Sequence, residues 1–142
     1  MTKEDLDGEW STGNCRRAVQ LYFRAEHGLF LGPDDVLAPR GYYNTGHFVA
    51  VGSGGDAFKE LRCGDVIYAE KVRDSSGNEV RRGPQAFDSV DTYLISLHTA
   101  IFTGTRGWEI WHATAIAGGS CDWSVSKFLR YYRPIAAKRI VS

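Results

Sequence analysis

The feature that most constrains the fold is a pair of strongly apolar segments separated by a short turn. Residues 92–103 read TYLISLHTAIFT and residues 107–116 read GWEIWHATAI, with Gly104, Thr105 and Arg106 between them. Short loops that contain glycine commonly join two antiparallel strands. We therefore predict that the two segments form a β-hairpin.

This hairpin predicts that His98 and His112 lie together. If the three turn residues form the loop, Thr103 pairs with Gly107, and the same register puts His98 directly opposite His112. Directly opposed residues share one face of the sheet, whereas a shift of one residue would separate them. Two neighbouring imidazoles suit a proton relay or a metal site. The structural alternative is a pair of half-buried histidines that bond to the backbone.

A helix is predicted over residues 14–27, NCRRAVQLYFRAEH. Asn14 is a good N-cap, and Gly28 is a good terminator after the last turn. The apolar residues recur with the spacing of one helix face, which comprises Cys15, Ala18, Val19, Tyr22 and Phe23.

The rest of the chain predicts an α+β fold in which this helix precedes a small antiparallel sheet. We treat residues 1–142 as a single domain with insertions at about 32–60 and 72–91. Further strands are expected near 47–51, at 65–72, at 79–82 and at 135–141, and a short helix over 122–132.

Composition argues against several classes of protein. The 17 basic and 17 acidic side chains give a net charge of zero, which disfavours a nucleic-acid binder. The apolar runs are shorter than the roughly 18 residues that a membrane-spanning helix needs, and the polar start MTKEDLDGEW does not resemble a signal peptide. Three scattered cysteines fit neither a disulfide scaffold nor a zinc site. We expect no membrane partner, no metal and no cofactor.

Cys15 is the candidate nucleophile because it lies in the first turn of the predicted helix. Unpaired N–H groups at a helix start stabilise a thiolate, and the same groups can stabilise an oxyanion. The alternative is that Cys15 is a small buried hydrophobic residue. Cys121 is a rival nucleophile because it too can begin a helix, whereas Cys63 precedes a strand and is interpreted as structural.

Five segments in order resemble the NlpC-type cell-wall cysteine peptidases. These papain-like enzymes of bacteria and phages cut peptide bonds in the stem peptides of peptidoglycan. The family has a cysteine at the start of an apolar helix that ends in His-Gly, a Pro-Gly-Asp strand start, and histidines on two successive strands. The similar segments here are NCRRAVQLYFRAEHGLFLGP, LRCGDVIY, LHTAIFTG, IWHATAI and AAKRIV.

The resemblance implies a papain-like fold and a thiol mechanism without metal or cofactor. Cys15 would be the nucleophile, His98 the general base and His112 the residue that orients His98. Peptidoglycan would be the partner. The expected substrate contacts are Trp10, Asn14, Tyr42, Tyr43 and Trp111.

Departures from the family leave two alternatives open. Asn14 replaces the aspartate before the family's cysteine, and Arg16 and Arg17 replace the Ser-Gly after it. These changes favour a non-catalytic wall-binding or virion-assembly module on the same fold. A thiol acyltransferase or amidase is the alternative among enzymes.

The chain is also similar to the N-terminal peptidase modules of phage endolysins, including those of phages that infect mycobacteria. This similarity implies residence in the host cytoplasm before release to the wall through a holin, or secretion. It also implies further endolysin domains in a longer parent chain.

Overall fold

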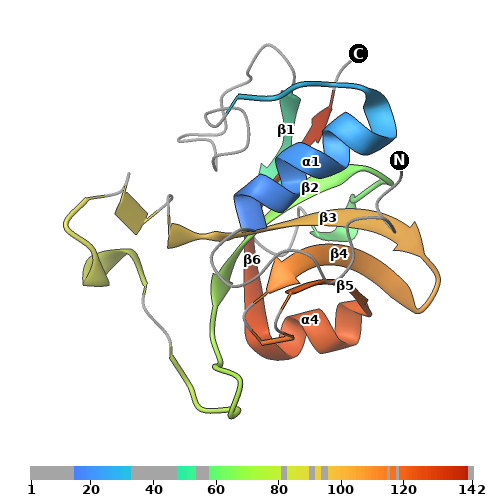
Figure 1. The fold of residues 1–142 in the computed structure, drawn as a ribbon. Helices are drawn as coiled ribbons and strands as arrows, with labels where there is room; N and C mark the ends of the chain where they lie inside the picture. Colours follow the sequence, from blue (N-terminus) through green and yellow to red (C-terminus); the bar gives the residue numbers. More distant parts are fainter. Residues whose placement is uncertain are drawn as a thin grey trace.

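The computed structural model describes residues 15–32, 48–53, 58–80, 83–89, 92–93, 96–114, 116–117 and 119–140. These residues form an α+β fold around a six-stranded antiparallel sheet in the order β1-β6-β2-β3-β4-β5 (Figure 1), which confirms the predicted class. The elements are α1 (Cys15–His27), β1 (Phe48–Ser53), β2 (Asp65–Lys71), a 3-10 turn (Pro84–Ala86), β3 (His98–Thr105), β4 (Trp108–Thr114), β5 (Gly119–Trp123), α4 (Val125–Tyr131) and β6 (Tyr132–Ile140).

Helices α1 and α4 cover opposite faces of the sheet. Successive side chains of a strand point to opposite faces, so each strand contributes to two apolar clusters. The cluster under α1 contains Phe23, Ile101 and Trp111. The cluster under α4 contains Ala100 and Phe128, and this second cluster includes further residues from β2, β4, β5 and β6.

Helix α1 confirms the helix that was predicted over residues 14–27. The four residues Ala18, Val19, Tyr22 and Phe23 of its apolar face are buried. Gly28 ends the helix with φ at +63°, a conformation that side chains with a Cβ rarely adopt, and its N–H donates to the carbonyl of Arg24. Asn14, the expected N-cap, lies outside the described residues.

The prediction of a strand over residues 92–103 is wrong in its first half. Thr92, Tyr93 and Ser96 are helical, and β3 begins only at His98. The hydroxyl of Ser89 accepts a hydrogen bond from the backbone N–H of Thr92, which begins a helical turn. This local capping prevails over the apolar pattern, which by itself does not separate a buried helix from a strand.

The segment after β4 also differs from the prediction. Residues 119–123, expected to be a break followed by a helix, form β5 and pair with β4. Helix α4 starts at Val125, after the Ser124 side chain accepts a hydrogen bond from the N–H of Lys127. Ser124 is therefore the N-cap of α4. Cys121 lies in β5 and does not begin a helix.

Two other predicted strands differ in length from the structure. In place of the strand predicted at 79–82, the described residues form a single β-bridge between Arg73 and Glu79, and residues 81–82 lie outside the described part. The last strand begins at Tyr132, earlier than predicted, and includes Pro134. Pro134 is tolerated in this interior strand because it pairs with Ala69 where the register shifts.

The predicted strand near 47–51 corresponds to β1, which pairs with β6. In the described part of the chain, no helix is both long and apolar enough to cross a membrane.

A buried ion pair joins the start of β2 to the end of β6. Asp65 is only 1% exposed, and its two carboxylate oxygens accept hydrogen bonds from Nε and Nη2 of Arg139 at 2.9 and 2.8 Å. The backbone N–H of Arg62 donates to the same carboxylate at 2.9 Å. The two-pronged contact fixes the geometry of the pair, and removing one partner would leave the charge of the other uncompensated in a partly buried place.

We expect Asp65→Ala to lower the free energy of unfolding by about 3 kcal/mol, because it leaves the Arg139 guanidinium without its carboxylate partner. Urea unfolding followed by circular dichroism measures this loss. The matched control is Asp74→Ala, which removes a turn carboxylate that accepts two backbone N–H groups, and should cost about 1 kcal/mol. Equal losses in the two variants would show that the ion pair has no special role.

Candidate functional site

The two histidines of the hairpin are in direct contact. His98 Nε2 lies 2.7 Å from His112 Nδ1, and the ring centroids are 5.0 Å apart at an interplanar angle of 72°. This distance is short enough for a hydrogen bond between the two imidazoles. The prediction that the hairpin brings them together is confirmed.

The predicted register of the hairpin is nevertheless wrong. Phe102 pairs with Ile110, whereas the predicted loop would pair it with Trp108. The strands are therefore offset by one full side-chain period, because Gly104 and Thr105 extend β3 past an irregularity in the ladder. An offset of two residues preserves the face, so His98 and His112 become diagonal neighbours and their rings still meet.

Aromatic rings from β5, α4 and β6 surround the pair. Tyr132 stacks on His98 at 4.3 Å between centroids and 16° between planes. Trp123 meets His112 edge-on at 4.6 Å, and Phe128 lies 5.6 Å from the same ring. The pair is thus enclosed between the sheet and α4.

Burial keeps both imidazoles neutral. Burial, with a smaller contribution from the positive charge of Lys71, lowers the pKa of His98 from 6.5 to about 3. Burial also lowers the pKa of His112 well below 6.5, with contributions from His98 and from Lys127. Near pH 7 the bond therefore joins two neutral rings, one of which donates and the other accepts.

The two rings differ in access to water. His112 is fully buried, and its Nε2 has no hydrogen-bond partner among the described residues, whereas His98 is partly exposed. If His98 Nε2–H donates to His112 Nδ1, the remaining nitrogen of His98, Nδ1, carries a lone pair. In this tautomer His98 can accept a proton while His112 holds its orientation.

Helix α1, which begins with Cys15, packs on the face of β3 and β4 opposite to the two imidazoles. Figure 1 shows the dark blue first turn of α1 above the point where β3 begins, and α1 packs on β3 and β4. Burial and the negative charges of the Cys15 and Cys121 thiolates together raise the pKa of Tyr132 to about 12, while a hydrogen bond to Thr114 opposes the rise.

The thiols have different relations to the histidines. Within the described residues, Cys15 Sγ makes no hydrogen bond to either imidazole. Cys121 lies directly opposite His112 in the pairing of β4 with β5. The interpretation of Cys63 as structural agrees with its position at the other end of β3, where its Sγ donates to the Thr103 carbonyl at 2.6 Å.

The expected substrate contacts are only partly described. Trp111 is 0% exposed in the cluster under α1, which leaves no surface of its ring for a substrate. Its predicted binding role is therefore replaced by a packing role, because the register directs it to the opposite face from His112. Four other expected contacts, Trp10, Asn14, Tyr42 and Tyr43, lie outside the described residues.

Sequence reasoning did not identify Tyr132 and Lys71 as neighbours of His98. Both come from strands that are distant in sequence, so only the sheet order reveals them. Among the described residues, no group of three or more His, Cys, Asp or Glu side chains is arranged to hold a metal ion.

Comparison with known proteins identified no relative of this chain. No family model matches the chain, and no curated protein or solved structure matches it.

The histidine pair predicts a loss of stability in acid. Between pH 6.5 and about 3, the unfolded chain binds a proton at His98 that the folded chain does not bind. The free energy of unfolding should therefore fall as the pH falls, by at most about 1.4 kcal/mol per pH unit for each buried histidine. Urea unfolding at pH 7, 6 and 5 measures the slope.

His98→Gln should have a shallower slope than the wild type over this range, because it removes one of these protons. His27→Gln is the matched control, because His27 is exposed on α1. The idea fails if His98→Gln and the wild type have the same slope.

Proposed function

We propose that this chain is a cysteine peptidase with a papain-like fold, and that it hydrolyses an amide bond in peptidoglycan stem peptides. The observation that carries the proposal is the bond between His98 and His112 on β3 and β4, the two strands on which α1, with Cys15 at its start, packs from the opposite face. A base, a residue that orients it and a thiol at a helix start are the three parts that such a mechanism needs.

In the first step, Nδ1 of His98 takes the proton from the Cys15 thiol. The thiolate attacks the substrate carbonyl carbon and forms a C–S bond, while the carbonyl oxygen becomes negative. Backbone N–H groups at the start of α1 stabilise this oxyanion. His112 accepts a hydrogen bond from Nε2–H of the imidazolium, which offsets the cost of a buried positive charge.

In the second step, the C–N bond breaks and His98 gives its proton to the leaving amine. The product on the protein is a thioester. Water, deprotonated by His98, then attacks the thioester and releases a carboxylic acid, and the proton returns to the Cys15 thiol.

The assignment of a stem peptide as substrate rests on the order of the five sequence segments. Four of them lie on successive elements: the cysteine segment starts α1, the LRCGDVIY segment leads into β2, and the two histidine segments lie on β3 and on β4. A helix that precedes an antiparallel sheet and carries a thiol at its start supports the papain-like assignment.

One observation favours a non-catalytic wall-binding or assembly module on the same fold. Within the described residues, the Cys15 thiol makes no hydrogen bond to an imidazole, although such contacts often tighten only when substrate binds. Labelling with iodoacetamide at neutral pH separates the two proposals, because an activated thiolate reacts much faster than a structural thiol.

Activity of single variants on purified peptidoglycan is the main test. We expect Cys15→Ala to abolish the release of new amine and carboxyl ends, identified by mass spectrometry. His98→Ala should slow the reaction by about 100-fold or more, because it removes the general base. His112→Ala should slow it less, because orientation contributes less than proton transfer.

Cys121→Ala and Cys63→Ala are the matched controls, and both should retain activity. If Cys121→Ala abolishes hydrolysis while Cys15→Ala does not, the nucleophile is the thiol opposite His112, and the proposed mechanism is wrong. Full activity in Cys15→Ala with all three cysteine variants folded would also contradict it.

A further inference from the structure

A pocket of about 470 Å³ lies between the turn of the β3–β4 hairpin and the start of α4. Among the described residues that line it, none is Cys15, His98 or His112, so the pocket is distinct from the candidate site and does not depend on the proposed function. Its walls include Phe58, Phe102, Gly107, Glu109, Ser124 and Val125.

Two backbone groups hold the Glu109 carboxylate in this pocket. Its Oε1 accepts a hydrogen bond from the N–H of Val125 at 3.0 Å, and its Oε2 accepts one from the N–H of Gly107 at 2.6 Å. Both bonds stabilise the anion, so they lower the pKa of Glu109 below its usual value. An ionised carboxylate offers about four acceptor positions, so this one can still bind a donor from a ligand.

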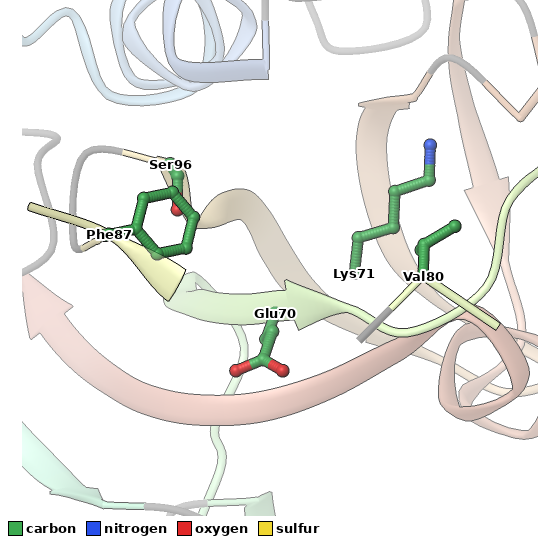
Figure 2. A pocket seen from close by; sticks show the side chains of 5 residues that line it. All are labelled: Glu70, Lys71, Val80, Phe87 and Ser96. Atoms are coloured by element: carbon green, nitrogen blue, oxygen red, sulfur yellow. The ribbon is translucent and has the colours of Figure 1, made fainter. Parts of the chain in front are cut away.

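The negative charge of Glu109 is not balanced by a neighbour. Within the described part of the chain, no Lys, Arg or His side chain pairs with it. The pocket at the end of β2 (Figure 2) differs, because its carboxylate, Glu70, pairs with Arg133 at 3.0 Å and Lys71 also lines it. The unbalanced negative charge therefore makes the Glu109 pocket suited to a cation.

Two phenylalanine rings supply the apolar part of the pocket. Phe58 and Phe102 are half-buried and pack against the cluster under α4. Phe58 stacks on Phe128 at 6.4 Å between centroids and 15° between planes, which fixes its orientation. An aromatic face attracts a cation, and an apolar wall accommodates the aliphatic chain that carries it.

We propose that this pocket binds an organic cation, a guanidinium or ammonium group carried on an aliphatic chain. The cation pairs with the Glu109 carboxylate, while the chain that carries it packs against Phe58 and Phe102. The Ser124 hydroxyl oxygen accepts one hydrogen bond from the N–H of Lys127 and can accept another from the ligand. The basic side chain of a peptide and a free alkyl guanidine such as agmatine share this chemistry.

Titration of the wild-type protein, followed by proton–nitrogen NMR, tests the pocket and detects weak binding. The probes are a tripeptide with a central arginine and blocked ends, the same peptide with citrulline in place of arginine, and agmatine. Citrulline keeps the shape of arginine without its charge. We expect the arginine peptide to bind about tenfold more tightly than the citrulline peptide, as one charge-assisted contact allows.

The shifted amide signals should include Gly107 and Val125, which donate to Glu109. Tighter binding of the arginine peptide than of agmatine supports the pocket and identifies a protein side chain as its ligand. Tighter binding of agmatine supports the pocket and identifies a free amine. Equal affinity for the arginine and citrulline peptides, or no binding of any probe, overturns the proposal.

Glu109→Gln should bind the arginine peptide about tenfold more weakly than the wild type, because the amide keeps the shape of the side chain and removes its charge. Glu79→Gln is the matched control, because Glu79 is exposed, does not line the pocket and gives the same change in net charge. An equal loss in the two variants would mean that overall charge governs binding, which also overturns the proposal.

Phe58→Leu separates the aromatic contact from simple apolar packing. It should weaken binding of the arginine peptide, because leucine fills the same place without a ring face. The comparison of arginine with citrulline needs only the wild-type protein, so it decides the proposal even if a variant fails to fold.

Discussion

The pairing of β3 with β4 is the constraint on which the rest of the structure depends. Because side chains alternate across a strand, this one ladder divides the apolar residues of both strands between α1 and α4. Ile101 and Trp111 go under α1, while His98 and His112 go to the face that α4 covers. A shift by one residue would exchange the two faces and put the imidazoles under α1.

The histidine pair is costly to build, and the surrounding structure offsets that cost. His112 is fully removed from water and His98 partly so, and the Nε2 atom of His112 is left without a hydrogen bond among the described residues. The bond between the rings and the stacking of Tyr132 on His98 supply favourable contacts in return. A buried polar arrangement that costs stability is typical of functional sites, where proton transfer requires unusual surroundings.

Local patterns predicted the elements that are stabilised locally. Helix α1 was predictable because its apolar face and the glycine that ends it lie within one short segment of the sequence. The adjacency of His98 and His112 was predictable because side chains alternate between the faces of a strand. The observed register differs from the predicted one by two residues, so both histidines stay on the same face. The helical turn at Thr92 and Tyr93, the strand β5 and the burial of Trp111 were not, because each depends on a cap or on partners elsewhere in the fold.

By itself, the sequence determined the class of fold, the helix that carries Cys15 and the hairpin that carries the two histidines, because periodicity acts over a few residues. Only the tertiary structure decided the hairpin register, the aromatic surroundings of the pair, the placement of Cys121 opposite His112 and the position of Lys71 beside His98. These features arise where strands from distant parts of the chain become neighbours, and that neighbour relation is set by the packing of the whole sheet between its helices.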